Sequence, residues 1–180
     1  MVKGITCAKG AVKVIALIGF TGAGKSTLGK LLSRNYGLPC YDNDEFVEKM
    51  MKMPIREIFS VYGEQRFREL EAESIANRLN TTGHGVLVTG GGAPLAKETR
   101  ELLTKRALTV HVQVSLDEII RRLETDHTRP LLQGGNHERV TMLYMEREHL
   151  YDFAHEVVAG TDLSLAAAQV MAKWMAFSTK

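Results

Sequence analysis

The sequence predicts an α/β fold, a three-layer α/β/α sandwich around a central parallel sheet of about five strands. Short apolar runs, typical of strands buried on both faces, alternate with longer segments whose apolar residues recur at helical spacing. This alternation is typical of a parallel sheet that is covered by helices on both sides. Glycine-rich or acidic segments follow three of the predicted strands, at 19–26, 42–44 and 90–92. Because ligands bind beyond the carboxyl ends of such strands, we expect these segments to form one site.

The first half of the chain alternates three predicted strands with four predicted helices. The run 14–18 is wholly apolar and ends at Gly19, which suits a buried strand. A helix over 28–36 stops at Gly37, since glycine is favoured just after helix ends. Pro54 suits the first turn of a helix that runs to about residue 62. The remaining predicted elements are a strand at 38–41, a helix marked by Phe46, Val47, Met50 and Met51, a helix over 64–79 and a strand at 86–89.

The second half continues the same alternation. The stretch 125–137 is polar and contains Pro130, Gly134 and Gly135, so we expect an exposed loop there. The run 156–159 is the weakest of the predicted strands. The other predicted elements are helices over 95–105, 116–123, 138–151 and 164–177 and a strand at 108–114.

The composition is that of one ordinary globular domain. The chain has 180 residues, of which 44% are hydrophobic and 24% charged, and this argues against disorder and against fibrous repeats. A chain of this length buries roughly 70% of its unfolded surface, which is enough to sustain a core. We therefore expect a single domain over 1–180, with an N-terminal tail over 1–11 and a lid loop over 125–138.

Charge and cysteine content exclude several classes of partner. Lys and Arg number 23 against 21 for Asp and Glu, so a net charge of +2 gives no bulk attraction for nucleic acid or an anionic membrane. Cys7 and Cys40 are too few for a disulfide scaffold or a cysteine-based zinc site and suit free thiols in a reducing cytosol. No apolar run approaches the roughly 18 residues of a membrane span. We expect a cytoplasmic monomer that binds neither nucleic acid nor membrane.

Residues 19–26, GFTGAGKS, fit the phosphate-loop pattern G-x-x-x-x-G-K-[ST] between a predicted strand and a predicted helix. Glycines let backbone N–H groups converge on a phosphate, and the helix N-terminus adds positive potential. Lys25 can reach the β- and γ-phosphates, and the Ser26 hydroxyl can bind Mg²⁺. A glycine-rich turn that merely caps a helix is the alternative. The filled pattern favours a nucleoside triphosphate but does not identify the group that receives the phosphate.

Asp42 and Asp44 follow the second predicted strand and allow two interpretations. Aspartate is favoured at helix N-caps, and Asp42 with Glu45 has the spacing of a capping box. Beside a phosphate loop, a pair of carboxylates can instead hold Mg²⁺ through water and hydrogen-bond the hydroxyl of an acceptor.

Three further features also allow both a structural and a functional interpretation. Arg68 has Glu64 and Glu71 on its own helical face, so it is either part of a solvated ion-pair stripe or an arginine positioned to bind an anion. Three successive glycines at 90–92 are either a plain turn or a place where a ligand approaches the backbone. Arg129 precedes Pro130 on the polar loop, as a lid cation would, although a surface arginine is the alternative.

In these segments the sequence resembles the shikimate kinases, small proteins of the nucleoside-monophosphate-kinase-like P-loop group. The phosphate loop is shared by many families, whereas the run G-E-x-x-F-R-x-x-E together with D-x-D and R-P-L-L is far more specific. The resemblance spans 19–151, about three quarters of the chain, in the family's order. The matching pieces are GFTGAGKST, DND at 42–44, IFSVYGEQRFRELE at 58–71, VTGGG at 88–92, RPLL at 129–132 and REHLY at 147–151.

The resemblance implies a P-loop kinase fold and specific site residues. Asp44 would hydrogen-bond the ring hydroxyls of shikimate, Arg68 and Arg147 would bind its carboxylate, and Lys25, Asp44 and Arg129 would be catalytic. Arg129 would reach the transferring phosphate, and Arg122 would pack against adenine. The implied residues are Gly22, Ala23, Gly24, Lys25, Ser26, Thr27, Arg122 and Arg129 for ATP, Asp44, Phe59, Phe67, Arg68, Gly90, Gly91, Gly92 and Arg147 for shikimate, and Ser26 and Asp42 for Mg²⁺.

One departure from the family concerns the adenine loop. The family usually has a proline shortly after a T-D or T-N pair, whereas Thr161-Asp162-Leu163-Ser164-Leu165 has none. We therefore expect the selectivity for the nucleotide base to be looser.

The resemblance implies that the chain phosphorylates the 3-hydroxyl of shikimate with ATP and Mg²⁺, a step of aromatic amino acid biosynthesis. A gluconate or nucleotide kinase of the same group is one alternative, since gluconate is also a polyhydroxylated carboxylate. A catalytically silent binding paralogue is another, and a nucleotide switch protein is disfavoured because no separate effector region is visible.

Overall fold

The computed structural model describes residues 14–124 and 137–178 and contains a five-stranded sheet in the order β2-β3-β1-β4-β5. Every neighbouring pair of strands is parallel, which confirms the predicted sheet. The strands are β1 (Val14–Ile18), β2 (Cys40–Asp42), β3 (Gly85–Val88), β4 (Leu108–Gln113) and β5 (Glu156–Ala159).

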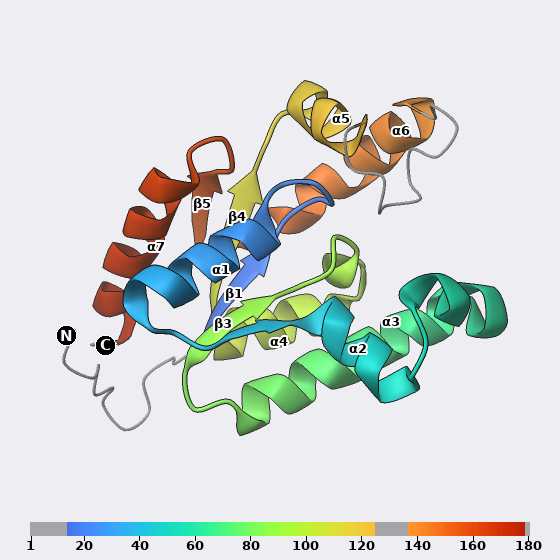
Figure 1. Cartoon of the computed structure of the whole chain (residues 1–180), viewed down its shortest axis with the longest axis horizontal. Coiled ribbons are helices and arrows are strands. Elements are labelled where there is room, and N and C mark those ends of the chain that lie inside the picture. The colour runs from blue at the N-terminus through green and yellow to red at the C-terminus, as the bar shows by residue number, and fades with distance from the viewer. Residues whose placement is uncertain (1–13, 125–136, 179–180) are drawn as a thin grey trace.

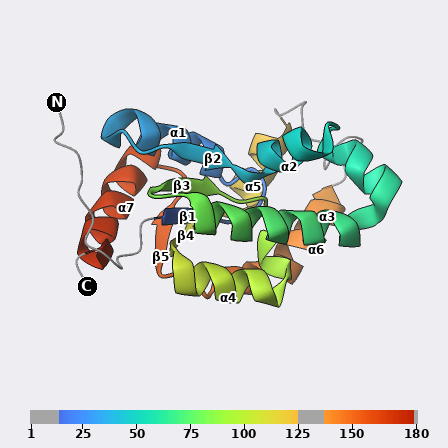
Figure 2. The ribbon, with the colours of Figure 1, turned by 90° about the horizontal axis from the view of Figure 1, so that it is seen from below.

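Helices follow the strands along the chain, as the sequence predicts. Within the described ranges they are α1 (Lys25–Tyr36), α2 (Asn43–Met51), α3 (Ile55–Thr81), α4 (Lys97–Arg106), α5 (Leu116–Glu124), α6 (His137–Arg147) and α7 (Leu163–Ser178), with short 3₁₀ helices η1 (Ala93–Leu95) and η3 (Glu148–Tyr151). Figures 1 and 2 show α1 and α7 on one face of the sheet and α3 and α4 on the other, so the layers are those of an α/β/α sandwich.

The central strand β1 supplies side chains to both halves of the core. Ile15 and Leu17 belong to the cluster that includes Trp174 of α7, whereas Ala16 and Ile18 belong to the cluster on the α3–α4 side. All five residues of β1 are buried. Burial on both faces explains why this strand is a continuous apolar run rather than an alternating one.

A third hydrophobic cluster joins α2 to the first part of α3, beside the carboxyl end of β2. Val47 of α2 packs there with Ile58 and Phe67 of α3, so this part of the molecule has its own small core. Figure 1 shows α2 with the first part of α3 on one side of the sheet's carboxyl edge and α5 with α6 on the other. Gly63 lies inside α3 with φ 79° and ψ 168°, and this kink separates the two helices predicted to 62 and from 64.

Several boundaries differ from the prediction for local reasons. α1 begins at Lys25 because Gly24, with φ 99°, ends the preceding loop in a left-handed conformation. The helix predicted over 95–105 starts two residues later, at Lys97, because Leu95 is the last residue of η1. The predicted helix over 138–151 ends at Arg147 and continues as η3.

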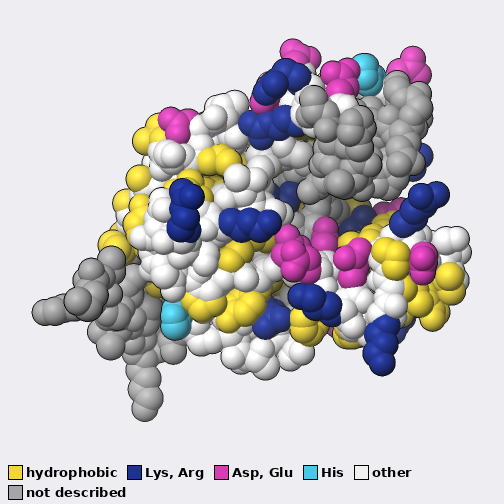
Figure 3. Space-filling model, in the orientation of Figure 1, with side chains coloured by type: hydrophobic (Ala, Val, Ile, Leu, Met, Phe, Trp, Pro, Cys, Tyr) yellow, Lys and Arg dark blue, Asp and Glu magenta, His cyan; other side chains and the backbone are white. Residues whose placement is uncertain are grey.

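The tail 1–11 and residues 125–136 of the predicted lid loop lie outside the described residues, whereas 137 and 138 begin α6. No helix in the described part of the chain is both long and apolar enough to cross a membrane. Lys and Arg side chains are interspersed with Asp and Glu side chains on the face seen in Figure 3.

Candidate active site

The phosphate loop connects β1 to α1, where the sequence predicts it. Gly22 and Gly24 have φ values of 80° and 99°, which other residues rarely adopt, so glycine is required for this path of the backbone. Lys25 is only 7% exposed, and its Nζ donates hydrogen bonds to the carbonyl oxygens of Gly19 at 2.7 Å and Phe20 at 2.8 Å. The lysine is therefore held across the loop before any phosphate arrives.

A cavity of about 340 Å³ opens beside this loop. It is bounded by the start of α1, by α5 and by the turn between β5 and α7. Its lining comprises Gly22, Gly24, Lys25, Ser26, Thr27, Arg122, Leu123, Gly160, Thr161 and Leu163. Six of the eight residues assigned to ATP from the sequence therefore line one cavity, and a seventh, Ala23, lies between two lining residues.

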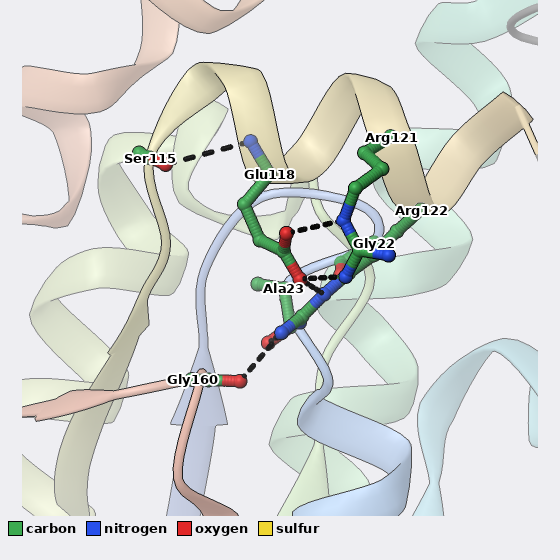
Figure 4. Close-up of polar contacts among 7 residues, drawn as sticks. All are labelled: Gly22, Ala23, Ser115, Glu118, Arg121, Arg122 and Gly160. Atoms are coloured by element: carbon green, nitrogen blue, oxygen red, sulfur yellow. Dashed lines mark hydrogen bonds and ion pairs between the residues drawn. The ribbon is translucent and has the colours of Figure 1, made fainter.

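Arg122 crosses from α5 to the loop and bonds to main-chain oxygens on both sides of the cavity. Its guanidinium donates to the carbonyl oxygens of Gly22 at 3.2 Å, Ala23 at 3.1 Å and Gly160 at 2.9 Å (Figure 4). Glu118, four residues earlier on α5, accepts a further hydrogen bond at 2.7 Å. Sequence reasoning missed this role of Glu118, although its spacing from Arg122 places both side chains on one helical face.

Asp162, in the turn that follows β5, stabilises the start of α7. The Asp162 carboxylate accepts hydrogen bonds from the backbone N–H groups of Ser164 and Leu165, and α7 begins beside it. Leu163 lines the cavity next to this turn.

Asp42 has the N-cap role that its sequence allows, and it also reaches the phosphate loop. It is the N-cap of α2, and its Oδ1 accepts a hydrogen bond from the Asp44 backbone N–H at 3.1 Å. Its other oxygen, Oδ2, accepts from the Ser26 hydroxyl at 3.0 Å. The same carboxylate thus ends β2, starts α2 and reaches the phosphate loop. Two hard oxygen donors side by side suit Mg²⁺, which takes few protein ligands and binds the rest of its shell from phosphates and water.

Arg68 lies on α3 between two carboxylates and above two aromatic rings. It donates to Glu71 Oε2 at 2.8 Å and to Glu64 Oε1 at 3.0 Å. Its guanidinium carbon is 5.1 Å from the ring centroid of Phe67 and 5.9 Å from that of Phe59. The side chain is 19% exposed, so the arginine is fixed in place while part of its surface still faces solvent.

Glu71 is buried beside the acceptor segment. Its side chain is 3% exposed, and Oε1 finds no hydrogen-bond partner among the described residues. Burial raises the pKa of Glu71, and the neighbouring Arg68 offsets part of the rise. A carboxylate oxygen that points to the site without a protein partner is suited to accept a hydrogen bond from a hydroxyl or a water.

The three glycines after β3 are close to groups from both halves of the site. A Cβ on Gly90 would lie 2.5 Å from Glu71 Oε1 and 2.7 Å from Asp44 Oδ1, and a Cβ on Gly91 would lie 2.8 Å from the Thr21 backbone nitrogen. A Cβ on Gly92 would overlap the Arg68 guanidinium. The segment 90–92 is therefore more than a plain turn, because side chains there would displace the residues predicted to bind ligands.

Tyr151 connects this glycine segment to the end of α6. Its hydroxyl donates to the Gly91 carbonyl oxygen at 2.8 Å, and its ring stacks on His111 with the centroids 4.8 Å apart. Burial lowers the pKa of His111 to about 4, with the charge of Lys25 acting in the same direction and Asp152 opposing it. Sequence reasoning did not assign a role to Tyr151, and its position four residues after Arg147 was the available signal.

Arg147 is the last residue of α6 and is half-buried. Its charge, like that of Arg68, acts on the Tyr151 hydroxyl, whose pKa is nevertheless raised by burial. The charges of the two arginines predicted to bind a carboxylate thus both act on the same tyrosine. Arg129, the predicted lid cation, lies outside the described residues.

Comparison with known proteins agrees with this geometry. The sequence model of the shikimate kinase family matches residues 21–177. Shikimate kinases of Moorella thermoacetica and Geobacter sulfurreducens are 41% and 44% identical, over 86% and 76% of this chain and 88% and 76% of theirs.

Solved structures show the same relationship. Shikimate kinase from Acinetobacter baumannii in complex with shikimate is 32% identical, with a TM-score of 0.80 over 90% of this chain and 94% of that chain. A gluconokinase from Sinorhizobium meliloti is 15% identical with a TM-score of 0.59, over 95% of this chain and 96% of the other, and shares the fold alone.

Proposed function

The chain belongs to the shikimate kinase family, and we propose that the residues described above carry out the ATP-dependent phosphorylation of the 3-hydroxyl of shikimate. One observation carries this proposal: the glycine segment beside Arg68 lies directly against Thr21 of the phosphate loop. An acceptor bound to Arg68 would therefore lie next to the terminal phosphate of a nucleotide in the loop. The product, shikimate 3-phosphate, belongs to aromatic amino acid biosynthesis through chorismate.

On the donor side, the backbone N–H groups of Gly22, Ala23 and Gly24 are assigned to the phosphates of ATP. The Lys25 ammonium would leave two carbonyl oxygens and bind the β- and γ-phosphates, an exchange of neutral acceptors for charged ones that favours the nucleotide. Thr27 lines the same cavity, and Arg122 is assigned to the adenine ring.

Ser26 and Asp42 are the residues that would hold Mg²⁺, because their adjacent oxygens match its preference. A bound Mg²⁺ neutralises charge on the phosphate oxygens. Asp42 also positions Asp44 through the N-cap hydrogen bond, so a change at Asp42 would disturb the acceptor side as well.

On the acceptor side, Arg68 and Arg147 are assigned to the carboxylate of shikimate and Asp44 to its hydroxyls. Phe59 and Phe67, whose ring centroids are 4.7 Å apart, would flank the ring, and Gly90, Gly91 and Gly92 would allow it to approach the backbone. Asp44 would orient the 3-hydroxyl and accept its proton as the phosphoryl group transfers.

Phosphoryl transfer needs positioning and charge neutralisation more than covalent chemistry from the protein. Lys25 supplies a cation from the described residues, and Arg129 is proposed to supply a second from the lid. Closure of a lid would exclude water and limit hydrolysis of ATP without an acceptor.

A coupled assay for ADP release with shikimate as the sole acceptor tests the proposal. We expect ADP release that requires shikimate and is at least tenfold slower with gluconate or with a nucleoside monophosphate. Faster release with either of those acceptors would assign the chain to a different substrate, and binding of both ligands without turnover would make it a silent paralogue.

We further propose that the chain acts as a single-domain monomer in the cytoplasm. Light scattering after gel filtration should give the mass of one 180-residue chain, and a stable dimer would contradict the monomer.

A further inference from the structure

Glu118 lies at the start of α5 and binds two successive arginines. Its oxygens accept from Arg121 Nε and Nη2, both at 2.7 Å, and from Arg122 Nε, also at 2.7 Å (Figure 4). The Arg121 side chain is 70% exposed, whereas the side chains of Glu118 and Arg122 are 20% and 25% exposed. Of the two ion pairs of Glu118, the one with Arg122 is therefore the more buried, and Arg122 lines the nucleotide cavity.

Arg122 connects two loops whose spacing decides the width of that cavity. It bonds to Gly22 and Ala23 of the phosphate loop and to Gly160 after β5. The loops touch beside it, because a Cβ on Gly160 would lie 2.6 Å from the Ala23 carbonyl oxygen. With Nε bound to Glu118, the remaining guanidinium nitrogens are directed at the three carbonyl oxygens.

We infer that Glu118 is a positioning residue for nucleotide binding, which acts by holding Arg122 in the orientation that braces the phosphate loop against the turn after β5. This inference rests on the proposed function, because it takes the cavity beside Arg122 to be the nucleotide site. Glu118 itself does not line the cavity.

Charge repulsion alone predicts the opposite change in nucleotide affinity when Glu118 is neutralised. The direction of that change therefore tests the inference. A negative charge near a triphosphate repels it, so removal of an acidic side chain should leave nucleotide affinity unchanged or raise it. Two arginines hold the pKa of Glu118 at about 2, so the residue carries its charge at any working pH. If Glu118 acts by positioning, its neutralisation lowers nucleotide affinity even though a repulsive charge is lost.

Two neighbours on the same helix provide matched controls. Asp117 is exposed and also lies in the first turn of α5, so Asp117→Asn removes an equal charge with an equal effect on the helix terminus. Arg121→Gln removes the exposed half of the Glu118 pairing and leaves Arg122 in place.

The experiment measures dissociation constants for ADP and for shikimate separately, by titration calorimetry, on full-length variants. We expect Glu118→Gln to weaken ADP binding by about 5- to 20-fold, with shikimate binding within twofold of the starting protein. Asp117→Asn and Arg121→Gln should both stay within twofold for ADP. In an Arg122→Met background, Glu118→Gln should add less than twofold, because its effect passes through Arg122.

An ADP affinity for Glu118→Gln that equals or exceeds that of the starting protein would overturn the inference. An undiminished effect in the Arg122→Met background would overturn it as well. If Glu118→Gln unfolds, Glu118→Asp keeps the charge but retracts the carboxylate, and the same loss of ADP affinity is expected. Because binding is measured without turnover, a failure to phosphorylate shikimate would count against the proposed function and not against this inference.

Discussion

The donor and acceptor ends of the site are stabilised by different kinds of contact. At the donor end, Lys25 and Arg122 donate to main-chain carbonyl oxygens of the loops around them. At the acceptor end, Arg68 pairs with two glutamates, and Glu71 lies beside Asp44 around one glycine. At the donor end the backbone forms the site, and its cations are bonded to carbonyl oxygens of the loops. At the acceptor end the site is a network of charged side chains.

Because of this difference, substitutions at the two ends should have different effects on ligand binding. Backbone N–H groups bind any triphosphate, so side-chain changes at the donor end should matter only where the side chain supplies one of its cations or holds one in position. The acceptor end depends on side chains from α2, α3 and the segment after β3, which meet in a partly desolvated region. Single substitutions there should change which acceptor binds, with little effect on the nucleotide.

The largest effect is expected for Lys25→Met. Loss of the cation that faces the transferring phosphoryl group should lower turnover about 1,000-fold or more. Shikimate affinity should stay within about threefold, since Lys25 belongs to the donor end. Single-turnover kinetics and a shikimate titration check this, and residual turnover above a tenth of the starting rate would contradict the role of Lys25.

Arg68→Ala should break the acceptor end selectively. It removes charge-assisted hydrogen bonds to the substrate carboxylate, and shikimate binding should weaken about 100-fold while ADP binding stays within twofold. Arg66→Ala is a matched control, because Arg66 is an exposed arginine on the same helix paired with Glu69. Equal losses for both ligands, or equal effects at Arg66 and Arg68, would show that the two ends are not separate.

The parts of this arrangement that are continuous in the chain could be predicted from the sequence. The phosphate loop is one continuous segment, and the strand over 14–18 has the predicted bounds because burial on both faces leaves an apolar run. Even the weakly predicted strand over 156–159 is present, at the edge of the sheet.

The contacts that brace the site join residues far apart in the chain and leave no local pattern. The hydrogen bond from Tyr151 to Gly91 spans 60 positions, and the one from Arg122 to Gly22 spans 100. Glu71 and Asp44 meet at Gly90 only because β2, β3 and α3 pack side by side. The resemblance to a family supplied the residues of the site, whereas the positioning contacts required the fold.

Tyr151→Phe should have a moderate effect confined to the acceptor end. It removes the hydroxyl that holds the Gly91 carbonyl but keeps the ring stacked on His111. We expect the KM for shikimate to rise about three- to tenfold and the KM for ATP to change less than twofold. Tyr144→Phe is the control, since its hydroxyl also donates to a backbone oxygen, but to that of Val114 rather than to one of the glycines. Indistinguishable effects of the two changes would remove the positioning role of Tyr151.

The smallest expected effect is on how the free energy of unfolding depends on pH, and it involves His111. The folded-state pKa of His111 is lowered from 6.5 to about 4, so its contribution to stability is present above pH 6.5 and is lost as the pH falls toward 4. His111→Phe should make the unfolding free energy less dependent on pH over that window. Urea unfolding at several pH values tests this, and parallel curves for His111→Phe and the starting protein would contradict it.

The proposed reaction is tested most directly by measuring the phosphorylated product against the ADP released in one reaction with ATP and shikimate. We expect one shikimate 3-phosphate for each ADP, identified by NMR, and no ADP release in the absence of shikimate. ADP release that does not require shikimate, or a phosphate on a different hydroxyl, would contradict the proposed reaction.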